Sequence, residues 1–314
     1  MKKITIDEKT QNQRLDKFLK KYFKEATGGF LYKMLRKKNI TLNGKKATGN
    51  ELLNAGDEVS VFFSDETFDK MRGITTGFDL SLYILDEDPL DIVYENEDFI
   101  ALNKHKDMLS QKAKDSDISL NEYVLSYLVK NNKLTADDLS LYKPSCINRL
   151  DRNTTGLIFA AKTYKGAKDL SLLFKEKDHP KVYRCICAGE IKEEMLLKHY
   201  LIKDEDTNTV RVVEDALPDA KEIVTGITPI KTNGKITLLE VKLYTGRTHQ
   251  IRAHLSYIHH PVIGDYKYGD DVLNKEFKKN YSVSSQLLHS YEMDIPGVGK
   301  LVAPIPEEFE RVFD

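Results

Sequence analysis

The sequence has no tryptophan and only three cysteines among 314 residues. Three cysteines are too few to hold a chain of this length together by disulfides, and they fit a reducing compartment. No apolar run approaches the roughly 20 residues that a membrane span needs, and residues 1–21 carry charges throughout. We therefore expect a soluble, cytoplasmic protein with no membrane partner.

Motifs for common cofactors are also missing. No Gly-x-Gly-x-x-Gly run follows a strand pattern, and no phosphate-binding loop with Lys-Ser or Lys-Thr is present. Cys185 and Cys187 stand two apart, but a metal site needs more ligands at suitable spacing, and His179 and His199 are isolated in the sequence. We expect no metal and no cofactor, and we expect the two cysteines to pack on one face of a strand.

Charge is balanced overall but unevenly distributed. Residues 1–62 hold 14 basic and 7 acidic residues, a net charge of +7, whereas the remainder holds 34 and 42, a net charge of −8. Such asymmetry is typical of a basic segment that binds nucleic acid in front of a near-neutral or acidic body. A charged helix face is also common as plain solvated surface, so charge alone leaves both interpretations open.

The stretch from 148 to 163, NRLDRNTTGLIFAAKT, joins a polar loop to a short apolar run. The run at 157–161 predicts a buried strand, entered through a tight turn at Gly156. In the loop, Asp151 lies between Arg149 and Arg152, and neighbouring cations favour the ionised form of a carboxylate. From spacing alone, Asp151 is either an ordinary loop ion pair or a reactive group.

A second motif, TGRTHQIRAHL, covers residues 245–255. It predicts a helix that Thr248 caps, with Arg252 one turn further on the face away from the core. His249 and His254 are five apart and do not share a helix face, so they do not predict a metal pair.

Together these stretches resemble the RluA-type pseudouridine synthases. The family signature is His-Arg-Leu-Asp, two residues, then Thr-Ser-Gly-Leu; here Asn148 stands for the histidine and Thr155 for the serine. The family's Thr-Gly-Arg-x-His-Gln-Ile-Arg motif matches residues 245–252 at each position. The resemblance covers about residues 90–314. It implies that Asp151 is the catalytic aspartate and that Arg252 pairs with it.

The resemblance also implies roles for two other side chains. Tyr183 follows a lysine in its strand and would lie beside the aspartate, where its ring could stack on a flipped uracil or its phenol could pass a proton. Arg149 would fill the space that the target base leaves, or clamp a phosphate. The implied reaction breaks the C1′–N1 bond of a uridine and joins C5 to C1′. Asp151 could attack C1′ or take a proton from C2′.

One stretch departs from the family pattern. Where the family has Lys-Pro-x-Gly, this chain has Lys104, His105, Lys106 and Asp107. The loop thereby lacks the fixed φ of proline and the permissive position of glycine. We expect a changed loop shape here and assign the stretch no catalytic role.

The basic N-terminal segment resembles the α-L RNA-binding domain of the ribosomal-protein S-four type. Two short helical patterns are followed by strands around the turns at 43–45 and 56–58. Such a surface would hold RNA mainly through phosphates. The candidate RNA-binding residues are Arg14, Lys17, Arg36, Lys37, Lys38 and Lys45.

The sequence thus predicts an α+β protein. We expect an RNA-binding domain over 12–62, a linker over 63–88, and a synthase domain over 89–314 with a mostly antiparallel, mixed central sheet and flanking helices. The predicted activity is that of a monomeric RNA pseudouridine synthase acting on structured RNA, with ribosomal RNA of the large subunit favoured over a lone tRNA arm. An RNA-acting hydrolase with Asp151 as its nucleophile is one alternative. Most such enzymes need a second carboxylate as the acid, and these motifs contain none. A non-catalytic RNA-binding or ribosome-assembly protein on the same fold is the remaining alternative.

Overall fold

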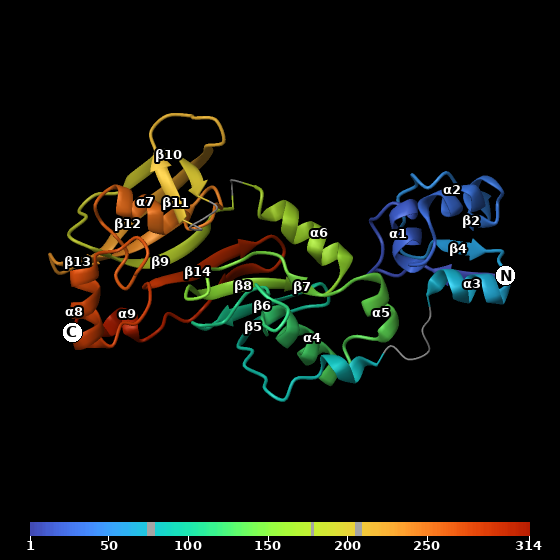
Figure 1. The fold of residues 1–314 in the computed structure, drawn as a ribbon, viewed down its shortest axis with the longest axis horizontal. Helices are drawn as coiled ribbons and strands as arrows, with labels where there is room; N and C mark the ends of the chain where they lie inside the picture. The colour runs from blue at the N-terminus through green and yellow to red at the C-terminus, as the bar shows by residue number, and fades with distance from the viewer. Residues whose placement is uncertain (74–78, 177–178, 205–208) are drawn as a thin grey trace.

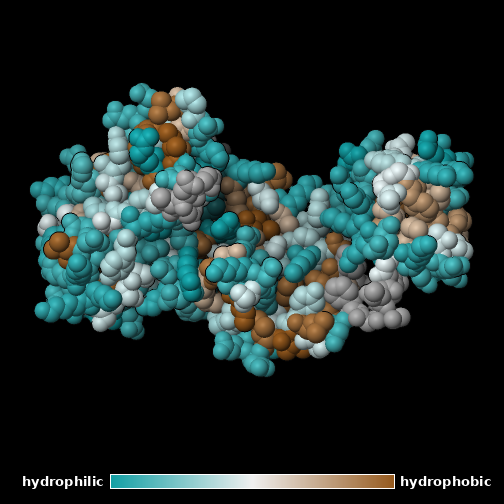
Figure 2. All heavy atoms as spheres, viewed as in Figure 1, coloured by the Kyte–Doolittle hydropathy of each residue, from teal (hydrophilic) through white to brown (hydrophobic). Residues whose placement is uncertain are grey.

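The computed structural model describes residues 1–73, 79–176, 179–204 and 209–314. Two units are distinguished by their sheets: an N-terminal unit, residues 1–73, and a C-terminal unit, residues 79–314. Figure 1 shows the N-terminal unit in blue at one end of the molecule and helices α8 (Asp271–Tyr281) and α9 (Glu308–Arg311) at the other. In Figure 2 hydrophilic side chains cover most of the visible face of both units, so each unit encloses its own core.

The N-terminal unit packs helices against a four-stranded antiparallel sheet of order β1-β4-β2-β3. Leu15, Phe18 and Leu19 recur at helical spacing and are buried together. The Thr27 side chain caps the second helix. Phe68, from the stretch expected to be a linker, lies in the same core. The elements are β1 (Lys2–Thr5), α1 (Leu15–Tyr22), α2 (Gly28–Arg36), β2 (Ile40–Leu42), β3 (Lys45–Lys46), β4 (Glu58–Val61) and α3 (Asp65–Arg72).

The C-terminal unit is built on an eleven-stranded sheet whose main path runs β11-β10-β12-β13-β9-β14-β8-β6-β5, with β7 and β15 at its side. β14 and β8 pair in parallel, and the other neighbours on this path are antiparallel, which confirms the predicted mixed sheet. The strands are β5 (Ile92–Glu95), β6 (Phe99–Lys104), β7 (Ser145–Cys146), β8 (Thr155–Ala161), β9 (Lys181–Ala188), β10 (Met195–Asp204), β11 (Thr209–Val213), β12 (Lys221–Thr232), β13 (Ile236–Leu243), β14 (Leu288–Ile295) and β15 (Gly299–Val302).

Alternate residues of a strand point to opposite faces of the sheet, and here both faces carry apolar residues that helices cover. Ile100 and Ile158 share a core with α4, whereas Phe99 and Phe159 share another with α6. A strand buried on both faces needs apolar residues at successive positions, which explains the continuous run at 157–161. The remaining elements of this unit are η1 (Leu80–Tyr83), α4 (Leu120–Lys130), α5 (Ala136–Leu141), α6 (Tyr164–Leu173) and α7 (Gln250–Tyr257).

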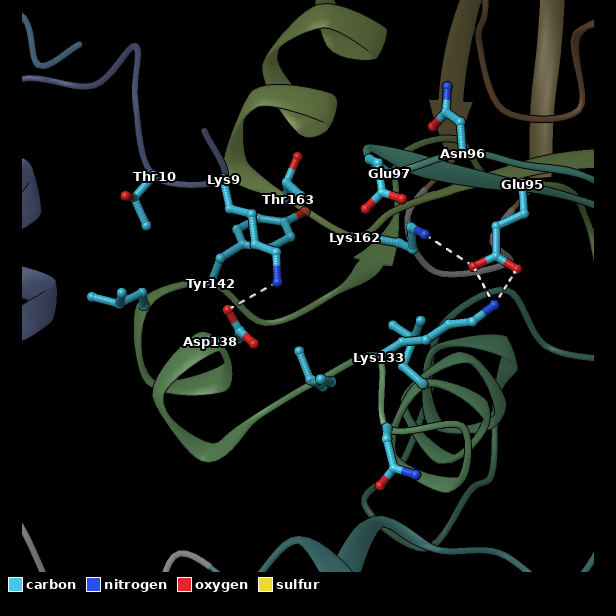
Figure 3. A pocket seen from close by; sticks show the side chains of 14 residues that line it. Lys9, Thr10, Glu95, Asn96, Glu97, Lys133, Asp138, Tyr142, Lys162 and Thr163 are labelled. Atoms are coloured by element: carbon cyan, nitrogen blue, oxygen red, sulfur yellow. Dashed lines mark hydrogen bonds and ion pairs between the residues drawn. The ribbon is translucent and has the colours of Figure 1, made fainter. Parts of the chain in front are cut away.

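The two units meet beside α5, where Leu141 packs against the N-terminal core. Lys9 Nζ lies 3.3 Å from Asp138 Oδ1 across this junction. A hollow of about 480 Å³ opens there, and Figure 3 shows the side chains that line it. Lys133 and Lys162 both bind Glu95, at 2.8 and 2.9 Å, so both ammonium groups already have a carboxylate partner. The hollow lies away from the signature loop, and we assign it no ligand.

Candidate active site

Asp151 lies on a tight turn that leads into β8. The Asp151 carbonyl accepts a hydrogen bond from the Thr154 N–H at 3.0 Å. The preceding Leu150 is held on both sides by one hydroxyl: Ser110 Oγ accepts from its N–H at 3.1 Å and donates to its carbonyl at 3.0 Å. Gly156 has a φ of +100°, and a Cβ there would lie 2.1 Å from a carbonyl oxygen of β14, so only glycine fits. The chain entering β8 therefore has little freedom.

The two departures from the family signature make polar contacts that stabilise this turn. Asn148 Oδ1 accepts a hydrogen bond from the Phe159 N–H at 2.8 Å. Thr155 Oγ1 lies 2.8 Å from His289 Nδ1 on the neighbouring strand. Neither side chain bonds to the Asp151 carboxylate, so both residues stabilise the loop that carries Asp151 and do not contact the reacting group.

Lys104 supports the same turn from the end of β6, a role the sequence does not reveal. Its side chain is buried, with the residue 1% exposed, and Nζ donates to the carbonyls of Arg152 at 2.7 Å, Thr154 at 2.9 Å and His105 at 3.0 Å. Burial lowers the pKa of Lys104 to about 8, although the charge of Asp151 opposes this shift. The ammonium thus ties the backbone that directly follows the aspartate to the loop that begins at His105.

The altered loop after Lys104 retains a turn of the kind that glycine makes. Asp107 has a φ of +65°, in the left-handed region that aspartate tolerates better than most residues. Its carbonyl accepts a hydrogen bond from Arg152 Nε at 3.3 Å. The loop therefore contacts the Asp151 turn despite the loss of the family's proline and glycine.

Arg252, from α7, lies between two carboxylates. Its Nη1 donates to Asp151 Oδ2 at 2.7 Å, and its Nε and Nη2 donate to Asp265 at 2.7 and 2.8 Å. The Arg252 and Asp265 side chains are 8% and 0% exposed, whereas that of Asp151 is 28% exposed. Burial disfavours the guanidinium charge, but the two carboxylates outweigh it and raise the pKa of Arg252. The structure thus brings together Asp151 and Arg252, which the sequence pairs only through the family resemblance.

Asp265 is a member of this cluster that sequence reasoning missed. Burial would raise its pKa, but hydrogen bonds from Arg252 and from the N–H groups of Lys267 and Tyr268 outweigh burial and lower it. The Gly264-Asp265 pair is visible beyond the helix motif, but its spacing does not show that the chain folds back on Arg252.

The start of α7 differs from the prediction. Thr248 was expected to cap the helix, but the N-cap residue is His249, which has a left-handed backbone with a φ of 53°. Within the described part of the chain, no side chain caps the first turn of the helix; Gln250 Oε1 instead accepts a hydrogen bond from the Arg247 N–H, in the loop before the helix, at 3.1 Å. As a result His249 faces the site: its Nε2 lies 3.8 Å from Asp151 Oδ1 and its Nδ1 lies 2.8 Å from the Tyr268 hydroxyl.

Tyr183 lies on β9, in register with Ser290 of β14. The residue is 6% exposed and belongs to the main core of the C-terminal unit. Burial raises the pKa of Tyr183 to about 12, a hydrogen bond with the Ser290 side chain lowers it, and the charge of Asp151 raises it further. The phenol is therefore protonated near neutral pH and within electrostatic reach of the aspartate.

The candidate RNA-binding residues are exposed, and all except Arg149 lie in the N-terminal unit. Arg149 is exposed two residues before Asp151. Arg14 is less available than its exposure indicates, because its guanidinium binds Asp16 at 3.0 and 3.1 Å and Asn50 at 2.5 Å. The others lie exposed in the N-terminal unit: Lys17, Arg36, Lys37, Lys38 and Lys45.

Comparison with protein families gives this cluster a context. A family model described as RNA pseudouridylate synthase matches residues 98–257, which include Asp151, Tyr183 and Arg252 and span about half of the chain. The chain belongs to the RNA pseudouridylate synthase family. A model of the S4 domain matches residues 13–59. Both resemblances are confirmed, and the enzyme class is that of an RNA pseudouridine synthase, an isomerase with RNA as its substrate.

Relatives of the synthase match it over nearly its whole length. It is 29% identical to an uncharacterized RNA pseudouridine synthase of Mycoplasma genitalium over 96% of this chain and 92% of that one. It is also 29% identical to ribosomal large subunit pseudouridine synthase C of Buchnera aphidicola, over 91% and 87%. The human RNA pseudouridylate synthase domain containing 1 superposes with a TM-score of 0.56 at 22% identity, covering 72% of this chain and 87% of that one, which shows a shared fold.

Histidines and cysteines elsewhere in the synthase serve packing. Cys185 and Cys187 are both buried on one face of β9. His199, which is isolated in the sequence, has a histidine neighbour in space: its Nδ1 lies 2.8 Å from His254 Nε2, and His254 Nδ1 lies 2.9 Å from Thr225 Oγ1. Among the residues described, no group of three or more metal-ligating side chains occurs, and no helix combines the length and apolarity needed to cross a bilayer.

Proposed function

We propose that the synthase isomerises specific uridines of ribosomal RNA of the large subunit, with Asp151 as its catalytic carboxylate. The observation that carries this proposal is the 2.7 Å contact between Asp151 Oδ2 and Arg252 Nη1. It joins segments 101 residues apart, and the Asp151 side chain stays 28% exposed, within reach of a substrate. Supporting the choice of RNA, several relatives bear the name ribosomal large subunit pseudouridine synthase C. Such a substrate implies work in the cytoplasm.

Asp151 supplies the anionic oxygen in this proposal, either to attack C1′ or to take a proton from C2′. Arg252 fixes the direction of the carboxylate, because charge-assisted hydrogen bonds are short and directional. The reaction is redox-neutral and has no leaving group: C5 loses a proton as it joins C1′, and N1 takes one up after its bond to C1′ breaks, so acid–base side chains suffice for it. We further propose that exposed Arg149 takes the place of the flipped uridine, since a guanidinium both stacks and donates hydrogen bonds.

We propose that the N-terminal unit holds structured RNA through its exposed cations. Lys17, Arg36, Lys37, Lys38 and Lys45 are exposed and would neutralise phosphates. Arg14 contributes less, because Asp16 and Asn50 already occupy its guanidinium. In Figure 1 the N-terminal unit lies at one end of the molecule, apart from β8, the strand that the Asp151 turn enters, which suits a substrate that is folded and extends well beyond the target uridine.

Tritium release from [5-³H]uridine-labelled transcripts tests the proposed function, because joining C5 to the sugar expels the hydrogen at C5. We expect release from large-subunit ribosomal RNA and little from small-subunit RNA or tRNA. Release confined to tRNA would reject ribosomal RNA as the substrate but would leave the pseudouridine synthase activity supported. No release from any of the three, with RNA still bound, would instead support the non-catalytic RNA-binding alternative.

Tyr183→Phe is expected to slow the chemical step about 10²–10⁴-fold, the usual effect of losing a group that moves a proton. The reason to favour this role over stacking is burial: a 6% exposed residue offers a uracil ring little surface. The measurement is single-turnover conversion at saturating enzyme, so that differences in RNA binding drop out. Ser290→Ala is the control, since it removes the partner of the phenol and keeps the phenol itself. A Tyr183→Phe rate within a few-fold of the parent would leave Tyr183 as a packing residue.

A further inference from the structure

Arg252 contacts Asp151 with one nitrogen only, because its other two nitrogens bind Asp265. A single hydrogen bond fixes one carboxylate oxygen and leaves the plane of the carboxylate free to turn about that contact. Among the residues described, no hydrogen bond reaches Asp151 Oδ1. The nitrogen that faces this oxygen is His249 Nε2, at 3.8 Å.

His249 is itself held from behind by Tyr268. The Tyr268 hydroxyl accepts a hydrogen bond from the Val210 N–H at 2.9 Å and lies 2.8 Å from His249 Nδ1. Burial raises the pKa of Tyr268, so the phenol keeps its proton at neutral pH and has it free to donate to Nδ1. An imidazole that accepts at Nδ1 carries its proton on Nε2. The N–H of His249 then points toward Asp151.

Burial is the main reason that this imidazole is neutral. Burial lowers the pKa of His249, the charge of Asp151 raises it, Arg252 and Lys267 lower it, and Asp265 raises it, with a net lowering. A neutral Nε2–H donor orients a carboxylate without forming an ion pair that would compete with Arg252 for its charge.

The backbone of His249 adopts an uncommon left-handed conformation at this position. A left-handed φ of 53° is uncommon for residues other than glycine, and such conformations cluster at functional sites. Here it aims the side chain at Asp151 rather than along the surface of α7. One short segment, 265–268, thus supports both flanks of Asp151: Asp265 holds Arg252, and Tyr268 holds His249.

We propose that His249 is a positioning residue for the isomerisation, and that its Nε2–H, directed by Tyr268, orients the reacting oxygen Oδ1 of Asp151. The inference rests on the proposed function of Asp151. When RNA displaces water from the site, the 3.8 Å gap closes to a hydrogen bond and the carboxylate is held at both oxygens. Catalytic hydrogen bonds are often long before the substrate binds.

Two substitutions separate this role from a structural one. His249→Asn tolerates the left-handed backbone and keeps a short acceptor toward Tyr268, but it has no donor at the place of Nε2. His249→Gln carries an amide long enough to return a donor to that place. We expect the asparagine variant to slow single-turnover conversion roughly 10- to 100-fold. The glutamine variant should recover most of that loss, with RNA affinity and melting temperature near those of the parent for both.

An NMR measurement tests the geometry without using activity. In protein labelled with ¹⁵N-histidine at neutral pH, His249 should be protonated at Nε2 and not at Nδ1, and Tyr268→Phe should weaken that preference. A proton found on His249 Nδ1 would overturn the proposal, whatever the conversion rates of the variants are.

The rate measurements overturn the proposal in two further ways. If His249→Asn converts RNA at the parental rate while the parent is active, only the role of His249 fails. If both variants are equally slow and melt earlier, the histidine is structural. A parent that releases no tritium from any RNA rejects the proposed function together with this role, which distinguishes the two failures.

Discussion

Asp151→Asn should fold, bind RNA and form no pseudouridine. Asparagine is nearly isosteric with aspartate, and its carbonyl oxygen can accept the hydrogen bond that Arg252 Nη1 now gives to Oδ2. The loss of charge should be tolerated, because Asp265 still neutralises the buried guanidinium. The amide cannot serve as an anionic nucleophile or as a base, so both routes open to Asp151 are closed. Tritium release under single-turnover conditions measures the effect.

Melting temperature and RNA affinity are the controls for this variant. The side chain of Asp151 is 28% exposed, so we expect both quantities to stay close to those of the parent. Residual release above a trace would mean that another group supplies the anion, and would refute the assignment of Asp151. A variant that fails to bind RNA would show that the carboxylate orients the substrate as well.

The pattern of the sequence predicts the elements that carry the site better than it predicts the contacts within it. The run at 157–161 predicts a buried strand because each successive residue is apolar, and β8 is indeed covered on both faces. The motif at 245–255 predicts a helix, and α7 follows, although one residue later than the Thr248 cap requires. Local rules fail at this start because a left-handed His249 is stabilised by contacts from Tyr268, far along the chain.

Residues that support the site from a distance escape sequence reasoning for the same physical reason. In the sequence Lys104 only begins a loop that departs from the family pattern, yet its ammonium binds carbonyls about fifty residues away along the chain. Asp265 appears as half of a turn. Hydrogen bonds between distant segments depend on how strands and loops are placed in space, and neither residue has a local pattern that encodes them. Burial of a charged side chain is the signal that identifies both, and it requires the fold.

Arg252→Met should destabilise the synthase by about 3–5 kcal/mol and abolish its activity. Removing one partner of a buried pair leaves the other charge uncompensated, and here Asp265 is 0% exposed. Asp151 loses its cation at the same time. Methionine is chosen because it fills a similar volume without a donor. Urea unfolding measures the free energy, and tritium release measures the activity.

The double variant Arg252→Met, Asp265→Asn separates the two effects. Asparagine removes the buried charge and keeps an oxygen for the N–H groups of Lys267 and Tyr268, so stability should largely return. Activity should stay lost, because the Asp151 carboxylate no longer has the hydrogen bond from Arg252 that sets its direction. A double variant as unstable as Arg252→Met would show that the guanidinium stabilises the fold by packing rather than by neutralising Asp265. A double variant that regains activity would show that Asp151 works without its arginine, since only the charge balance of the core had been repaired.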